Sequence, residues 1–340
     1  MIPFPDASLL LERLRRAHSA IRDAVVAACE HQAMEHLAAA VGDEAGDTVF
    51  ALDRISEGAL VAEFEELAER WPCVLVAEGV HHGRVMLPRG RSETDAKVII
   101  IVDPIDGTRG LMYQKRPAWI LTGVAPARGD GSAATLADIE LALQTEIPLV
   151  KQHLSDSLWH ADGRVGGERF NRVTGERTPL APRPSRADSI EQGYGAIARF
   201  FPGARDVLAA IDDAVVERVM GAAPRGRALS YEDQYISTGG QLYELMMGHD
   251  RWIADLRPLI EGVLRERGMP VGLCCHPYDL CTESIARAAG VVVTDVRGER
   301  LAAPLDVTSD VAWCGFANDA IRKRVYPALR AVLAEHGMHA

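Results

Sequence analysis

Hydrophobic residues recur along this chain with the spacing of amphipathic helices. Over residues 7–40, apolar side chains lie three or four positions apart, which predicts one buried face of a long helix: Leu10, Leu14, Ala17, Ile21 and Val25. The same reasoning predicts helices at about 56–70, 207–219 and 239–249. A closing helix is expected to begin near Asn318, a residue type that caps helix N-termini well.

Short, continuous apolar runs between these helices predict buried β-strands. The clearest is 98–102, where five consecutive β-branched residues suggest a strand covered on both faces. Further strands are expected at 74–77, 118–123, 290–296 and 311–316. Pro104 has no amide N–H for a sheet, so the central strand should end there. The alternation of helices and strands predicts a mixed α/β fold.

Two polar stretches interrupt this pattern. Residues 79–96 are expected to form a loop. Residues 171–190 contain three closely spaced prolines, which predict an extended connection. We place a boundary here between an N-terminal subdomain, 1–185, and a C-terminal subdomain, 186–340.

Candidate chemistry follows the central strand directly, in the run Asp103-Pro104-Ile105-Asp106-Gly107-Thr108. Two aspartates at a strand end repel each other unless protons or cations intervene, and ligand sets made only of oxygen suit hard cations, Mg²⁺ above all. Gly107 lets the backbone approach a ligand closely. A helix beginning at Gly107-Thr108 would direct free N–H groups toward a phosphate. The run predicts a metal and phosphate site, with an ordinary acidic turn as the alternative.

Composition narrows the class of protein. A chain of 340 residues with 48% hydrophobic residues can bury a large core, as one large domain or two. Its net charge of -11 argues against nucleic acid or an anionic membrane as a partner, and no apolar stretch approaches the roughly 20 residues of a membrane span. Six cysteines without a C-x-x-C pair, and no N-terminal apolar segment, predict a reduced, cytoplasmic protein.

Acidic residues beside two other strand patterns extend the motif. Glu78 follows the run 74–77, and Tyr278-Asp279 precedes the run 290–296. With these residues, the sequence resembles the inositol monophosphatase family, whose superfamily includes fructose-1,6-bisphosphatases and 3′(2′),5′-bisphosphate nucleotidases. Residues 103–123 match the family spacing without a gap, as does the small-residue segment 237–242. The resemblance implies a layered αβαβα sandwich, commonly dimeric, with Mg²⁺-dependent phosphatase activity.

The resemblance also assigns roles to residues. The ligands of two or three Mg²⁺ ions would be four carboxylates and one backbone carbonyl: Glu78, Asp103, Ile105, Asp106 and Asp279. Asp53 would pair with Thr108 to orient the attacking water, and Glu78 or this pair would accept its proton. The amides of Gly107 and Thr108 would bind phosphate oxygens. Two cations about 3.5–4 Å apart can lower the pKa of a bound water and stabilise an in-line phosphoryl displacement.

Few residues in the sequence are candidates for direct contact with the substrate. Arg109 directly follows the phosphate turn, so it could contact the substrate or be solvated. Asp255 lies where the family often has an acid that contacts substrate hydroxyls, but an insertion at about 256–275 separates it from Asp279. Tyr278 stands where the family usually has tryptophan. Glu283 is expected to be a solvated charge on a helix surface.

We therefore expect a Mg²⁺-dependent phosphatase acting on a small phosphorylated polyol or sugar, and a homodimer. A bisphosphate nucleotidase, favoured by Arg109-Gly110, is the first alternative, and a fructose-1,6-bisphosphatase is the second. An alternative of another class is a non-catalytic regulator that binds a phosphorylated metabolite. The retained acids count against that alternative, because facing carboxylates cost stability when no cation lies between them.

Overall fold

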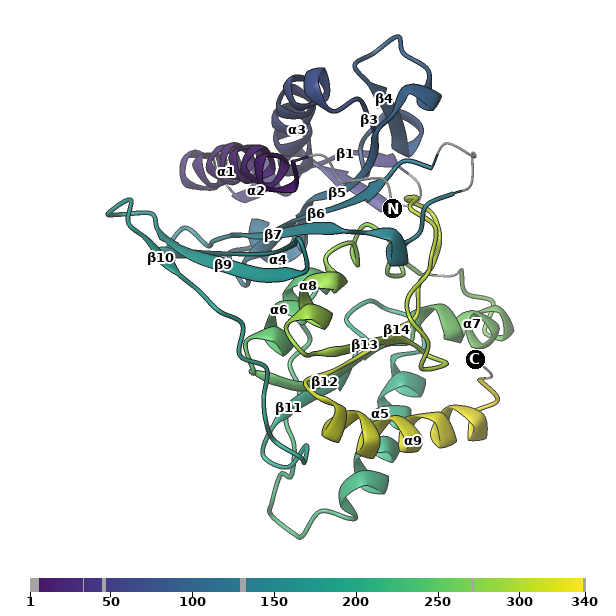
Figure 1. The fold of residues 1–340 in the computed structure, drawn as a ribbon. Coiled ribbons are helices and arrows are strands. Elements are labelled where there is room, and N and C mark those ends of the chain that lie inside the picture. The colour runs from purple at the N-terminus through teal and green to yellow at the C-terminus, as the bar shows by residue number, and fades with distance from the viewer. Residues whose placement is uncertain (1–5, 33, 45–46, 129–132, 271, 339–340) are drawn as a thin grey trace.

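Helices and sheets alternate in five layers along the molecule. The computed structural model describes residues 6–32, 34–44, 47–128, 133–270 and 272–338. Within these ranges an eight-stranded sheet and a four-stranded sheet lie one above the other, with helices outside each sheet and between the two (Figure 1). The expected αβαβα sandwich is confirmed.

The helices are α1 (Ala7–His31), α2 (Met34–Leu37), α3 (Ala51–Arg70), α4 (Thr108–Met112), α5 (Arg205–Met220), α6 (Thr238–Met246), α7 (Glu261–Glu266), α8 (Glu283–Ala288) and α9 (Asp319–Glu335). The strands are β1 (Ala40–Glu44), β2 (Asp47–Phe50), β3 (Cys73–Ala77), β4 (Arg84–Leu87), β5 (Val98–Asp106), β6 (Ala118–Pro126), β7 (Leu141–Ile147), β8 (Leu154–Ala161), β9 (Arg164–Asn171), β10 (Arg177–Pro179), β11 (Tyr194–Ile197), β12 (Asp250–Asp255), β13 (Val292–Asp295) and β14 (Trp313–Phe316).

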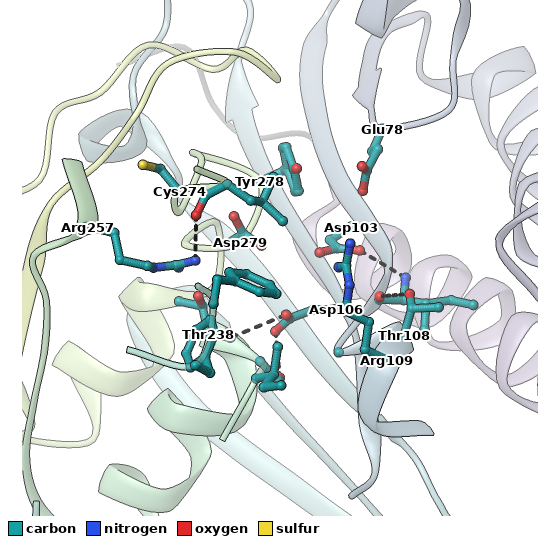
Figure 2. Close-up of a pocket in the computed structure, with 17 residues that line it drawn as sticks. Glu78, Asp103, Asp106, Thr108, Arg109, Thr238, Arg257, Cys274, Tyr278 and Asp279 are labelled. Atoms are coloured by element: carbon teal, nitrogen blue, oxygen red, sulfur yellow. Dashed lines mark hydrogen bonds between the residues drawn. The ribbon is translucent and has the colours of Figure 1, made fainter. Parts of the chain in front are cut away.

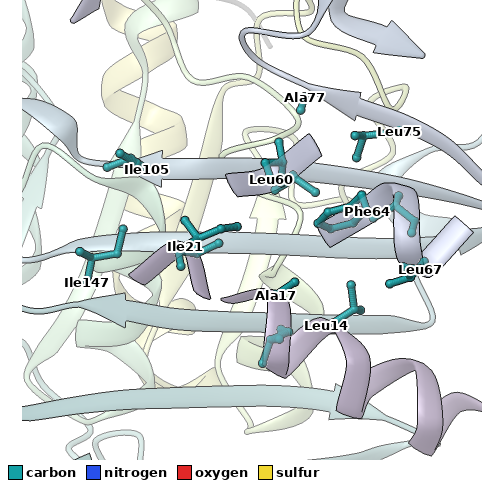
Figure 3. Close-up of a cluster of buried hydrophobic side chains, with 14 of the residues drawn as sticks. Leu14, Ala17, Ile21, Leu60, Phe64, Leu67, Leu75, Ala77, Ile105 and Ile147 are labelled. Carbon is teal, nitrogen blue, oxygen red and sulfur yellow. The ribbon is translucent and has the colours of Figure 1, made fainter. Parts of the chain in front are cut away.

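The large sheet has the order β10-β9-β8-β7-β6-β5-β3-β4, and its one parallel pair is β3 with β5. Helices α1 and α3 cover one face, because their apolar stripes pack on the sheet (Figure 3). Leu14 and Ile21 of α1 and Phe64 of α3 are almost completely buried there. Asp103 and Asp106 are therefore carried by a strand in the interior of the large sheet.

The other face of the large sheet packs against α6 and α8, which also contact the small sheet (Figure 1). The small sheet has the order β11-β12-β14-β13, and α5 and α9 cover its outer face. Asn318 caps α9 as expected, since its Oδ1 accepts a hydrogen bond from the Ile321 amide at 3.0 Å. Because α6 and α8 touch both sheets, the segments that carry 237–242 and Asp279 lie between the layers.

Several elements differ from the sequence expectation. The first expected helix ends at His31 rather than near 40. The helix expected at 56–70 is α3, which begins earlier, at Ala51, so Asp53 lies in the first turn of α3. The expected 79–96 loop contains β4. Strand β5 continues past Pro104, because its pairing with β6 is irregular between Asp103 and Asp106, where a missing N–H costs little.

Strands β7, β8 and β9 were not expected from the sequence. All residues of β9 are exposed or half-buried, so it lacks the apolar run or strict alternation that identifies a strand. The chain crosses from the large to the small sheet between β10 and β11, over residues 180–193, which overlap the expected 171–190 connection; that segment also contains β10. The subdomain boundary at 185 stays a prediction. No helix in the described ranges is long and apolar enough to cross a membrane.

Candidate metal and phosphate site

Asp103 and Asp106 lie at the end of β5, where the strand leaves regular pairing. Both are buried, with 3% and 6% of their surface exposed. Asp103 Oδ1 accepts a hydrogen bond from the Ile105 amide at 2.9 Å, which closes a tight turn around Pro104. That turn places both carboxylates on one side of the strand end, toward the layer that contains α6 (Figure 2).

The start of α6 holds the Asp106 carboxylate. Oδ2 accepts hydrogen bonds from Ser237 Oγ at 2.8 Å and from the Gly239 amide at 2.6 Å, and the Thr238 amide lies 3.3 Å from Oδ1. Position 239 requires glycine, since a Cβ there would lie 2.9 Å from Asp106 Oδ2 and 2.5 Å from a methyl of Leu121. The segment 237–242, identified from the sequence, thus supports a carboxylate.

Asp279 joins these two acids from the turn before α8. Its Oδ2 accepts a hydrogen bond from the His276 amide at 2.6 Å. One carboxylate oxygen from each of Asp103, Asp106 and Asp279 lies within 4.8 Å of the others. Glu78, at the end of β3, lines the same pocket and points toward Asp103 (Figure 2).

Crowding of these acids changes their ionisation. Burial, followed by the charges of Asp106, Asp279 and Glu78, raises the pKa of Asp103 well above its usual range. Burial and the charge of Asp106 do the same for the pKa of Asp279. Burial raises the pKa of Asp106 to about 6, although its hydrogen bonds act in the opposite direction. A cation between the carboxylates would remove this cost, and the all-oxygen donor set suits a hard metal ion.

Thr108 and Asp53 meet beside the acids, which is the pairing that the resemblance implies. Thr108 Oγ1 lies 3.0 Å from Asp53 Oδ1 and 2.9 Å from the Ile105 carbonyl oxygen. The second oxygen of Asp53 accepts a hydrogen bond from the Phe50 amide at 2.8 Å, which fixes the carboxylate at the start of α3. Gly107, with φ of +99°, makes the turn into α4, and a Cβ there would lie 3.0 Å from Ser237 Cβ.

A pocket with a volume of about 80 Å³ opens over this cluster (Figure 2). Eight of the ten residues proposed from the sequence line it: Glu78, Asp103, Ile105, Asp106, Gly107, Thr108, Arg109 and Asp279. Asp53 lies behind Thr108. Asp255 is fully buried beneath the pocket wall and is not one of the lining residues that the structure describes.

Arg257 lines the pocket in the place proposed for Asp255, and sequence reasoning missed it. Its Nε lies 2.9 Å from Asp255 Oδ1 and its Nη2 lies 2.5 Å from Oδ2, so the buried acid orients the guanidinium. The charge of Asp255 contributes to a raised pKa of Arg257, against the effect of burial. Its place two positions after Asp255, a proposed site acid, was the only available signal in the sequence.

Two adjacent aromatic rings complete this wall. Phe200 and Phe201 pack edge to face, with 4.9 Å between ring centroids. The Arg257 guanidinium carbon lies 4.6 Å from the Phe200 ring centroid, and that of Arg109 lies 5.2 Å from the Phe201 ring centroid. The pocket therefore presents two arginines, Arg109 and Arg257, in addition to the acidic cluster.

Glu283 is buried, whereas the sequence predicted a solvated charge on a helix surface. It is 1% exposed, and its Oε2 accepts a hydrogen bond from Arg287 Nε at 2.5 Å. The first turn of α8 faces inward between the sheets, which the local sequence does not reveal. Glu283 does not line the pocket described above.

By sequence, the chain matches no protein-family model and no curated protein. By structure, its fold is similar to those of a fructose-1,6-bisphosphatase and of a protein described as similar to inositol-1 monophosphatase. Fructose-1,6-bisphosphatase from Leishmania major, in its holo form, is similar with a TM-score of 0.68 and 14% identity, over 97% of this chain and 95% of that one.

Two other solved structures have comparable similarity in fold. The extragenic suppressor protein suhB from Bartonella henselae has a TM-score of 0.60 and 15% identity, over 95% of this chain and 98% of that one. A hypothetical protein from Pyrococcus horikoshii, described as similar to inositol-1 monophosphatase, has a TM-score of 0.62 and 13% identity, over 95% and 99% of the two chains. At these identities the comparison establishes the fold.

Proposed function

We propose that this protein is a Mg²⁺-dependent phosphatase that hydrolyses a small phosphorylated polyol or sugar. The observation that carries the proposal is the convergence of Asp103, Asp106 and Asp279 within 4.8 Å at the floor of a pocket that arginines also line. Acids gathered in this way are costly unless they bind cations. The fold shared with a fructose-1,6-bisphosphatase supports the same class of reaction.

Four carboxylates and one backbone carbonyl form the proposed metal-ligand set. Asp103, Asp106, Asp279, Glu78 and the Ile105 carbonyl would hold the metal. Bound Mg²⁺ would lower the pKa of a water and stabilise charge on the phosphoryl oxygens. The hydrogen bonds from the start of α6 hold Asp106 in place, so the protein need not reorganise this ligand when the cation binds.

Thr108 and Asp53 would orient the attacking water. The Thr108 hydroxyl has one proton, so it donates either to Asp53 or to the Ile105 carbonyl at any moment. When it donates to Asp53, its oxygen lone pairs can accept a hydrogen bond from water and fix the direction of attack. Glu78, or the Thr108 and Asp53 pair, then accepts the proton that the water loses.

The phosphate would contact the turn that directly follows Asp106. Gly107, Thr108 and Arg109 line the pocket, and their backbone amides and guanidinium would bind phosphate oxygens. Arg257 gives specific support to the alternative of a bisphosphate substrate, since a second cation in the pocket can pair with a second anionic group. We propose that Asp255 acts through Arg257 and does not contact substrate hydroxyls.

Release of inorganic phosphate tests the proposal directly. A panel of inositol monophosphates, sugar phosphates, sugar bisphosphates and 3′,5′-bisphosphonucleosides is assayed with Mg²⁺ and with chelator. We expect metal-dependent release by the wild-type protein and none by Asp103→Asn. Asp213→Asn, which changes an exposed acid on α5, is the matched control and should keep full activity.

The pattern across the panel separates the alternatives. Preference for bisphosphates would favour the nucleotidase or the fructose-1,6-bisphosphatase over the monophosphatase. Saturable substrate binding without phosphate release would indicate the non-catalytic regulator instead. The homodimer and the cytoplasmic location stay predictions, and sedimentation of the purified protein tests the first.

A further inference from the structure

We propose that Gln144 is a positioning residue that sets the distance between two of the acids, Asp106 and Asp279. The inference rests on the proposed function, because it assigns the metal cluster a support that the motifs do not contain. Gln144 lies in β7, is fully buried, and belongs to no segment that the sequence analysis selected.

Both ends of the Gln144 amide are used. Its Nε2 donates a hydrogen bond to the Gly239 carbonyl at 2.7 Å, and its Oε1 accepts one from Thr282 Oγ1 at 3.1 Å. One contact therefore reaches the start of α6, and the other reaches the turn before α8. The side chain connects two segments that are far apart in the sequence.

Each of these segments places one acid. Gly239 bonds to Gln144 through its carbonyl and to Asp106 Oδ2 through its amide, at 2.6 Å. Thr282 is fully buried three residues after Asp279, in the same run of turns. The path from Asp106 to Asp279 thus runs through Gly239, Gln144 and Thr282.

The surroundings of Gln144 make a polar residue there unusual. Its partners in register on the neighbouring strands are Leu121 and Leu158, both fully buried. A buried amide is costly unless its groups are hydrogen-bonded, and a leucine at this position would match the apolar face. The two hydrogen bonds that it makes, one to the residue that binds Asp106 and one to the turn segment that carries Asp279, account for the amide.

Repulsion between the acids explains why such a connection is useful. Carboxylates held within 4.8 Å tend to separate when no cation is present. If the α6 and α8 segments moved apart, only a fraction of molecules would present a closed ligand set, and the apparent metal affinity would be the intrinsic affinity multiplied by that fraction. Gln144 opposes this movement without contacting the metal.

Metal binding by the purified protein tests the role. Mg²⁺ is titrated into metal-free protein by calorimetry, and Mn²⁺ binding is followed by electron paramagnetic resonance. We expect Gln144→Met, which keeps the length but lacks both hydrogen bonds, to weaken metal binding about ten- to hundredfold. Thr282→Val should also weaken metal binding. Thr282→Ser keeps the hydroxyl and should bind metal with the wild-type affinity.

A matched control separates positioning from general stability. Gln152→Met also removes a glutamine, here half-buried, with two hydrogen bonds, to Glu146 Oε1 and to the Leu154 carbonyl, and Gln152 does not line the pocket of the proposed metal ligands. It should leave metal affinity unchanged. If Gln144→Met does not fold, the comparison of Thr282→Val with Thr282→Ser decides the question.

The possible results distinguish the two proposals. Wild-type affinity in Gln144→Met and Thr282→Val, even with a lowered melting temperature, would overturn the positioning role and leave the phosphatase proposal standing. A wild-type protein that binds neither Mg²⁺ nor Mn²⁺ would overturn both. Weaker binding in these two variants, with Gln152→Met and Thr282→Ser at the wild-type value, supports Gln144 as the connection.

Discussion

Adding Mg²⁺ to the metal-free protein should raise its melting temperature. The reason lies in the acidic cluster, where burial raises the pKa of Asp106 to about 6 from the usual 3.8. Near pH 7.5 a shift of this size costs on the order of 3 kcal/mol of folding stability. Burial and neighbouring acids also raise the pKa of Asp103 and Asp279, which adds to the cost. A cation bound only by the folded protein offsets it.

The expected rise can be worked out from chain length. Ligand at a hundredfold excess over its Kd stabilises the folded state by about 2.7 kcal/mol. Unfolding entropy of roughly 2.1 cal/mol/K per residue amounts, for this chain, to about 0.7 kcal/mol/K. The melting temperature should therefore rise by about 4 °C at saturating Mg²⁺.

The same charges determine the sign of the pH dependence. A carboxyl whose pKa is raised on folding stabilises the metal-free protein below its ordinary pKa, and this stabilisation is lost as pH rises through the raised value. For Asp106 that window runs from about 4 to about 6. The Mg²⁺-induced rise should thus be larger at pH 7.5 than at pH 5.5, where protons compete with the metal.

Differential scanning fluorimetry with Mg²⁺ or with chelator measures this rise. Asp103→Asn should melt higher than wild type without metal, because it removes one repelling charge, and should lose most of the Mg²⁺ response. Asp213→Asn should respond like wild type. A melting temperature indifferent to millimolar Mg²⁺, or a larger rise at pH 5.5 than at pH 7.5, would refute the reasoning.

Three further predictions follow from single contacts. Thr108→Val should lower kcat about 10²–10⁴-fold with little change in KM, since it removes the hydroxyl bonded to Asp53, whereas Thr108→Ser should recover most activity in steady-state assays. Arg257→Met should cost about 3–5 kcal/mol in urea unfolding, because Asp255 is left buried and unpaired, and adding Asp255→Asn should recover stability but not substrate affinity. His18, which burial holds at a pKa of about 3 between two threonine hydroxyls, should make the protein less stable as pH falls below about 6.5, by up to roughly 1.4 kcal/mol per pH unit; His18→Gln should flatten this slope in acid unfolding curves.

The local chemistry of the site could be predicted from the sequence. The acidic run after a β-branched strand requires only neighbouring residues, and the structure places Asp103, Asp106 and Thr108 together as that run implies. Helix α9 and its Asn318 cap were equally predictable, because periodicity and capping depend on residues within a few positions. The same holds for the turn at Gly107.

Sheet partners were harder to predict, because pairing joins residues far apart in the chain. Strand β9 has no apolar face of its own and is stabilised by pairing with β8 and β10. The position of Glu283 depends in the same way on α8 lying between two sheets. Burial of this kind follows from layers that no local pattern contains.

The amino-acid sequence by itself determined which acids are present, the turn that brings Asp103 and Asp106 together, and the helices with strong periodicity. Only the tertiary structure decided that Asp279 reaches the same point, that Arg257 rather than Asp255 faces the pocket, and that Gln144 connects the segments behind the acids. The physical reason is the range of the interactions. Turns and caps are made by neighbours in the chain, whereas the site closes only when the α6 and α8 segments pack against the large sheet.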